Sequence, residues 1–264
     1  MATEDLAVEM NLFEIFSSIQ GEGPHVGEST LFVRFGGCDL RCRWCDTPHT
    51  WRAASTCRVA LDFGHRAFRE ISNPISVETV VSATEGLGLK RHRYASLTGG
   101  EPLLQAEAVR ALSKELRRRG PLILLETHGL HVQALEHVLD VVDVVSMDWK
   151  LASDVWRAGE SGPDPKANFH DEHSRFLALA SRSAEVVVKV VVTPSTLDAE
   201  LDEMAGRVAE HGPGACIVLQ PVTPCGGVDA MPGAERLLEM VWRVNRQFPD
   251  VRLIPQTHRF YGAA

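Results

Sequence analysis

Cys38, Cys42 and Cys45 place three thiols within eight residues, directly after an apolar run that predicts a β-strand. Three thiolates can hold three irons of a cubane iron–sulfur cluster and leave the fourth iron open to a small molecule. A structural metal site would normally have every ligand position closed. The spacing therefore favours a [4Fe–4S] cluster that takes part in chemistry.

A structural zinc site of the Cys3His type is the alternative that the spacing leaves open, with His49 or another cysteine as fourth ligand. Zinc sites commonly combine two C-x-x-C pairs, and this sequence has no second pair. Each of the remaining cysteines is isolated in the sequence, and we interpret them as buried or idle thiols: Cys57, Cys216 and Cys225.

The elements that must position these thiols alternate between short β-branched runs and segments of helical periodicity. Strands are expected at Leu31–Gly36, Tyr94–Thr98, Leu122–Glu126, Val142–Met147, Glu185–Val192, Cys216–Gln220 and Val251–Ile254. Helices are expected at Ser76–Glu85, with Ser76 as N-cap, at Pro102–Arg119 and at Ala234–Gln247. No linker or repeat divides the chain, so residues 1–264 are expected to form one α/β domain.

About six βα units favour a barrel-like fold, in which the chemistry lies in the loops that follow the strands. Five polar loops begin where a predicted strand ends, at Gly37–Thr50, Gly99–Pro102, Thr127–Gly129, Asp148–Lys150 and Gln220–Cys225. Residues 52–73 lack clear periodicity and are a candidate cover for the site.

The composition is that of a water-soluble globular protein, with 44% hydrophobic and 23% charged residues. A formal charge of -8 argues against a protein that mainly grips nucleic-acid phosphates. The acidic N-terminus lacks the pattern of a secretory signal, and the apolar runs are too short to span a membrane. A cytoplasmic location is therefore expected.

The C-x-x-x-C-x-x-C spacing, with Trp44 before the last cysteine, resembles the cluster motif of the radical S-adenosylmethionine (SAM) superfamily. Residues 98–102, Thr-Gly-Gly-Glu-Pro, resemble the GGE motif of that superfamily, whose fold is a partial (β/α)6-type TIM barrel. In the superfamily, the strand edge and the residue that matches Glu101 bind the amino group of SAM.

The resemblance is closer to the 7-carboxy-7-deazaguanine synthases, and it extends from Phe13 to Gly262. Residues 14–23 are similar to the lead-in of that family, and residues 30–35 to its first strand. Residues 45–47, Cys-Asp-Thr, match a motif whose hydroxyl ligates Mg²⁺. Residues 126–129, Glu-Thr-His-Gly, resemble the family's E-T-N-G, with His128 in place of Asn. Residues 255–262 resemble its closing Q-T-H-K segment.

The resemblance implies a site with three groups of residues besides the cluster ligands. The residue implied for Mg²⁺ is Thr47. The residues implied for SAM are Gly100, Glu101, Asp148, Lys150 and Gln220. The residues implied for the substrate are Ile19, Gln20, Gly21, Glu22, Arg34, Thr98, His258 and the C-terminal Ala264.

The activity implied is conversion of 6-carboxy-5,6,7,8-tetrahydropterin to 7-carboxy-7-deazaguanine with loss of ammonia, a lyase reaction toward queuosine or related deazapurines. An electron donor such as flavodoxin or ferredoxin and a homodimer are implied as well. Two alternatives remain open. One is another radical SAM enzyme such as a glycyl-radical-enzyme activase, and the other is a nonenzymatic zinc-binding module.

Overall fold

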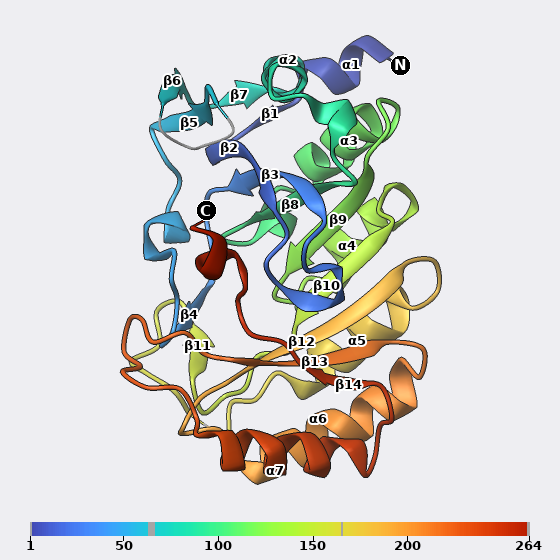
Figure 1. Ribbon diagram of the computed structural model, residues 1–264. Helices are drawn as coiled ribbons and strands as arrows, with labels where there is room; N and C mark the ends of the chain where they lie inside the picture. Colours follow the sequence, from blue (N-terminus) through green and yellow to red (C-terminus); the bar gives the residue numbers. More distant parts are fainter. Residues whose placement is uncertain (1, 63–66, 165, 263–264) are drawn as a thin grey trace.

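A large mixed sheet runs through the protein (Figure 1). The computed structural model describes residues 2–62, 67–164 and 166–262, and in this part of the chain ten strands form the sheet in the order β14-β13-β12-β10-β9-β8-β3-β2-β5-β6. These strands are β2 (Leu12–Ile19), β3 (Ser29–Phe35), β5 (Thr56–Ala60), β6 (Phe68–Ser72), β8 (Tyr94–Gly99), β9 (Leu122–Thr127), β10 (Val144–Asp148), β12 (Glu185–Val192), β13 (Cys216–Pro221) and β14 (Val251–Leu253).

Neighbouring strands from β3 to β14 are all parallel, as the βα alternation predicts. Beyond β3 the sheet continues with β2, which is antiparallel to β3, and then with β5 and β6. The stretch 52–73, which we considered as a cover for the site, therefore supplies two strands at one edge of the sheet. Two short pairs lie outside the sheet: β1 (Glu9–Met10) with β7 (Ile75–Ser76), and β4 (Leu40–Cys42) with β11 (Val155–Arg157).

The helices are α1 (Ala2–Ala7), α2 (Val77–Gly86), α3 (Ala106–Arg117), α4 (Val132–Val138), α5 (His170–Ala180), α6 (Asp198–His211) and α7 (Ala234–Asn245). Helix α1 precedes the first strand, and the others lie between successive strands. The short 3-10 turns are η1 (Gly23–His25), η2 (Pro48–Trp51), η3 (Leu89–Arg91), η4 (Pro102–Gln105), η5 (Leu139–Val141) and η6 (His258–Tyr261). Helices α3 to α5 lie on one side of the sheet, and the segment that ends in η6 lies on the other (Figure 1).

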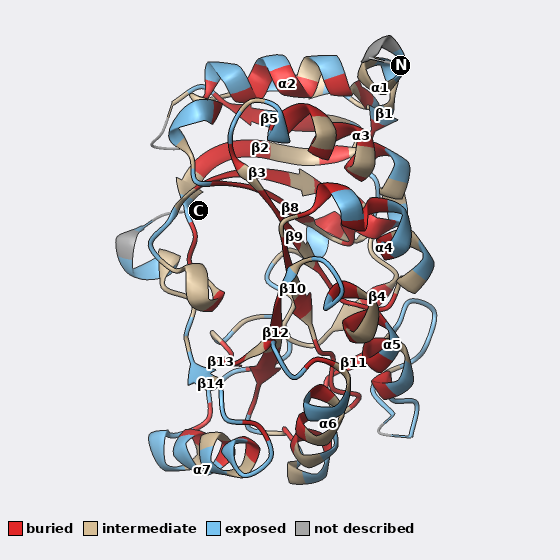
Figure 2. Ribbon diagram, turned by 90° about the vertical axis from the view of Figure 1, so that its right-hand side faces the viewer, coloured by how far each residue is buried: buried red, intermediate tan, exposed pale blue. Residues whose placement is uncertain are grey.

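The core lies between the sheet and these helices. Buried residues follow the strands and the inner faces of the helices, whereas the outer helical faces are exposed (Figure 2). Strand β12 has the burial expected of a central parallel strand, since its valines are buried on both faces. The predicted N-cap is confirmed: the Ser76 hydroxyl accepts a hydrogen bond from the Thr79 amide, a cap worth about 1 kcal/mol.

Four of the helices were not predicted: α1, α4, α5 and α6. The apolar positions of α4, α5 and α6 are interrupted by polar residues. In the described part of the chain, no helix has the length and apolar character required to cross a lipid bilayer.

Candidate functional site

A cavity is lined by residues from the C-terminal ends of the parallel strands and from the loops that follow them. Its volume is about 1340 Å³ including the open mouth. All five loops expected to carry chemistry contribute to its lining, and the described residues of β5 and β6 do not. The suggestion that residues 52–73 cover the site is therefore wrong for the described part of this stretch.

The loop that carries the three cysteines forms one wall of this cavity, and all three line it. Strand β4 holds the loop because it pairs with β11, where Cys42 lies opposite Val155. Burial raises the pKa of the Cys42 thiol to about 12 and that of the Cys38 thiol to about 11, although the Lys150 ammonium works against burial in both. Metal binding would displace these protons, because the thiolate is the ligand.

The zinc alternative finds no support in the arrangement of the thiols. In the described chain, only one set of three metal-binding side chains has ligand atoms within 4.8 Å of one another, and it contains no cysteine. Sulfurs on one zinc ion, each about 2.3 Å from the metal, would lie closer together than this limit. His49 is exposed, and its ring contacts Phe13 with centroids 5.1 Å apart.

The other cysteines divide into two kinds. Cys57 is buried in the core and Cys216 lies at the start of β13, away from the cavity, as predicted. Cys225 differs from the prediction. It lines the cavity, and its thiol lies 3.1 Å from the main-chain oxygen of Trp44.

Gly99 ends β8 and Gly100 follows it, and the neighbouring backbone leaves no room for a side chain at either position. A Cβ atom on Gly99 would lie 2.3 Å from the Phe35 oxygen, and one on Gly100 would lie 2.1 Å from the Gly37 oxygen. We expected these glycines to make room for a ligand, but they also allow the end of β8 to pack tightly against the cysteine loop. Both residues line the cavity.

Glu101 is fully buried and is not among the described residues that line the cavity. Its carboxylate accepts hydrogen bonds from the Leu103 amide (2.9 Å), the Thr127 hydroxyl (2.7 Å) and the His128 amide (2.8 Å). Glu101 therefore joins the loop after β8 to the end of β9. In this arrangement its carboxylate braces the site.

Alternating charges also line the cavity. Lys150 Nζ lies 2.8 Å from Asp148, Lys189 lies 3.3 Å from the other Asp148 oxygen, and Lys189 also pairs with Glu22. Burial alone would raise the pKa of Asp148 and of Glu22, but the lysine charges outweigh burial and lower both. Buried charges are stable only when paired in this way.

Gln220 also lines the cavity, and its buried Oε1 atom has no hydrogen-bond donor among the described residues. Such an acceptor usually has a partner in water or a ligand. This orphan atom, beside Asp148 and Lys150, fits a polar cofactor such as SAM.

The residues expected to contact the substrate lie around Glu126. Gln20 donates a hydrogen bond of 3.0 Å to one Glu126 oxygen, and Thr98 lies 3.3 Å from the other. Arg34 donates from Nε to Glu14 at 2.8 Å, and the described residues supply no partner for its terminal nitrogens. Arg34 lines the cavity, so those nitrogens can bind a carboxylate.

The remaining expected contacts lie at the mouth. His258 packs against Gly21, where a Cβ would meet the His258 ring at 2.3 Å, and the Thr257 amide donates to the Gly21 oxygen. Ile19 lines the cavity and is 37% exposed. Thr47 lines it as well, and its hydroxyl makes no hydrogen bond within the described part of the chain. Ala264 lies outside the described residues.

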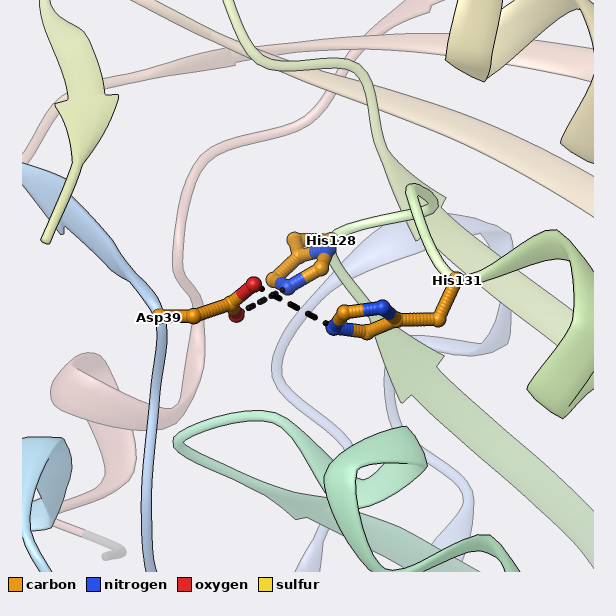
Figure 3. Close-up of side chains that lie close together, drawn as sticks. All are labelled: Asp39, His128 and His131. Carbon is orange, nitrogen blue, oxygen red and sulfur yellow. Dashed lines mark hydrogen bonds and ion pairs between the residues drawn. The ribbon is translucent and has the colours of Figure 1, made fainter.

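Asp39, His128 and His131 form a cluster of side chains (Figure 3). Asp39 and His128 lie in two of the predicted site loops, whereas His131 was not expected. Partial burial would raise the pKa of Asp39, but its contacts with the two imidazoles outweigh burial and hold it far below its usual range. The contact with Asp39 raises the pKa of His131.

Comparison with known proteins identifies the family. Residues 19–157 match the family model of a 4Fe-4S single cluster domain. The chain is 35% identical to the 7-carboxy-7-deazaguanine synthase of Geobacter sulfurreducens, over 95% of this chain and 96% of that protein. It is 36% identical to the synthase of Methanopyrus kandleri, over 95% and 92% of the two chains. This chain belongs to the 7-carboxy-7-deazaguanine synthase family.

The crystal structure of QueE from Escherichia coli has a similar fold, with a TM-score of 0.61 at 20% identity over 97% of this chain and 98% of that one. Among the charged residues at the site of this family member, Glu126, Lys189 and His131 were given no role from the sequence. Lys189 had a visible signal, because it is the one charge inside an otherwise apolar strand interior. The position of His131 depends on tertiary structure and left no such signal.

Proposed function

We propose that this protein is a radical SAM lyase that converts 6-carboxy-5,6,7,8-tetrahydropterin to 7-carboxy-7-deazaguanine with release of ammonia, in the biosynthesis of queuosine or related 7-deazapurines. The observation that carries the proposal is that Cys38, Cys42 and Cys45 line the same cavity as Arg34. Sequence identity above 30% over nearly the full length to named synthases supports it.

The proposed cofactors are a [4Fe–4S] cluster on the three cysteines and SAM beside it. When bound, the cluster supplies the electron that breaks a sulfur–carbon bond of SAM and so starts radical chemistry on the substrate. Gly100, Asp148, Lys150 and the free oxygen of Gln220 are proposed to hold SAM, with Glu101 acting through the backbone that it braces. We also propose Mg²⁺ at the Thr47 hydroxyl, since a hard cation prefers oxygen ligands.

The residues around the substrate bind and orient it. The terminal nitrogens of Arg34 can form a bidentate pair with the substrate carboxylate. Glu126, with Gln20 and Thr98, presents a polar edge that matches the N–H donors of a pterin ring. The main chain at Ile19–Gly21 and the side chains of Glu22 and His258 enclose the mouth, and closure of this kind keeps water from reactive intermediates.

Three further features belong to this proposal. The run of parallel strands from β3 to β14, each preceded by a helix or loop, supports a partial (β/α)6-type barrel. A flavodoxin or ferredoxin is proposed as electron donor. A homodimer is proposed as well, and the exposed Leu238 and Trp242 on α7 offer an apolar face for it.

The test is anaerobic reconstitution with iron and sulfide, followed by incubation with SAM, a reductant and the carboxylated pterin. We expect 7-carboxy-7-deazaguanine in the mass spectrum. SAM cleavage without any change in the pterin would point instead to another radical SAM activity, such as glycyl-radical-enzyme activation. A colourless protein that retains zinc would point to the zinc-binding module.

A further inference from the structure

A polar cluster joins the cysteine loop to the end of β9. Asp39 directly follows Cys38, and its carboxylate lies between two imidazoles (Figure 3). His128 Nε2 donates a hydrogen bond of 2.9 Å to one carboxylate oxygen, and His131 Nε2 lies 3.3 Å from the other. His128 is 5% exposed, so this contact is shielded from water.

The cluster continues into the loop after β8. The His128 amide donates to Glu101 at 2.8 Å, and the Glu101 amide donates to the Gly37 oxygen at 2.7 Å. Gly37 precedes Cys38, so both residues that flank this cysteine are tied to the same network. The network thus connects the cysteine loop, the end of β9 and the loop Gly99–Glu101.

We propose that Asp39, His128 and His131 are positioning residues that fix Cys38, and with it the cluster, relative to the loop that holds SAM. The inference rests on the proposed function. His128 stands where the resemblance expects Asn, and only the longer side chain places a donor at Nε2, where Asp39 accepts it. The same clamp holds the carboxylate of Asp39, a negative charge beside a thiolate ligand, in one place.

The decisive variants are His128→Gln and His128→Asn. Glutamine carries an amide nitrogen near the position of Nε2 and can still reach Asp39, whereas asparagine has the same polarity and is too short. Asp39→Ala removes the acceptor, and the double variant Asp39→Ala with His128→Asn completes a double-mutant cycle. His137→Asn is the control, since it breaks a comparable pair with Glu107 (2.8 Å) on the exposed surface of α4.

Two measurements are made on reconstituted protein under anaerobic conditions: the rate of iron release to a chelator, and the EPR spectrum of the reduced cluster with and without SAM. His128→Asn and Asp39→Ala should each release iron about 10-fold faster, as is typical when a partner of a metal ligand is lost. Both should alter the EPR change that SAM causes. The double variant should release iron no faster than the faster of the two single variants. His128→Gln and His137→Asn should behave as wild type.

The proposal would be overturned if His128→Asn had the same EPR spectra and the same rate of iron release as the wild-type protein. It would also be overturned if the fold-increases in iron release of the two single variants multiplied in the double variant, because the two residues would then act independently. Stoichiometric binding of one extra metal ion that disappears in His131→Asn would show a metal site in place of a clamp. A failure of the proposed function is distinguishable, since wild-type protein would then bind SAM at its cluster and leave the pterin unchanged.

Discussion

Replacing Glu101 by Gln tests whether this residue braces the site or contacts SAM directly. The carboxylate accepts from the Leu103 amide, the Thr127 hydroxyl and the His128 amide. A glutamine amide has one oxygen, so in either orientation its NH2 group faces a buried main-chain N–H. An unsatisfied buried donor costs about 2 kcal/mol. For a chain of this size that corresponds to a decrease in apparent melting temperature of about 4–8 °C.

The assay is anaerobic thermal unfolding of the reconstituted protein without SAM, together with equilibrium binding of SAM. We expect Glu101→Gln to lower both the melting temperature and the SAM affinity. Glu107→Gln on the exposed face of α3 is the matched control and should change neither. An unchanged melting temperature with lost SAM affinity would refute the bracing role, because it would show a direct contact with SAM.

Further predictions concern the cluster, the magnesium site and the charged wall. Alanine at Cys38, Cys42 or Cys45 should abolish iron and sulfide loading, while Cys57→Ala should leave both intact. Thr47→Ala should lose most of the rise in turnover with added Mg²⁺, and Thr47→Ser should keep it because the oxygen remains. Lys189→Met should lower the melting temperature more at pH 7 than at pH 4. Asp148 and Glu22, the carboxylates with which Lys189 pairs, have lowered pKa values. The stability that these ion pairs contribute is therefore present at neutral pH and is lost as the pH falls.

Much of the fold follows from local patterns in the sequence. The parallel strands were predictable because buried strands such as β12 are nearly continuous runs of β-branched residues. The extension of the sheet was harder to predict. Strand β6 alternates weakly and has no buried residue, and β2 carries polar residues among its apolar ones. Their pairing is a property of the assembled sheet and not of either segment alone.

Part of the functional site was also predictable from local sequence patterns, and part was not. The cysteines and the loop Gly99–Glu101 were predictable because their spacing reflects a chemical requirement. Lys189 and Glu126 come from different strands, and only the parallel register brings both to one cavity. The role of Glu101 also depends on tertiary structure, since its partners at Thr127 and His128 lie on the next strand.

The most direct measurement is single-turnover product analysis with wild-type protein and Cys42→Ala side by side. Both are incubated anaerobically with SAM, reductant and 6-carboxy-5,6,7,8-tetrahydropterin, and ammonia and 7-carboxy-7-deazaguanine are quantified together. We expect wild type to form the two products in equal amounts and Cys42→Ala to form neither. Consumption of SAM by wild type with neither product formed would contradict the proposed reaction.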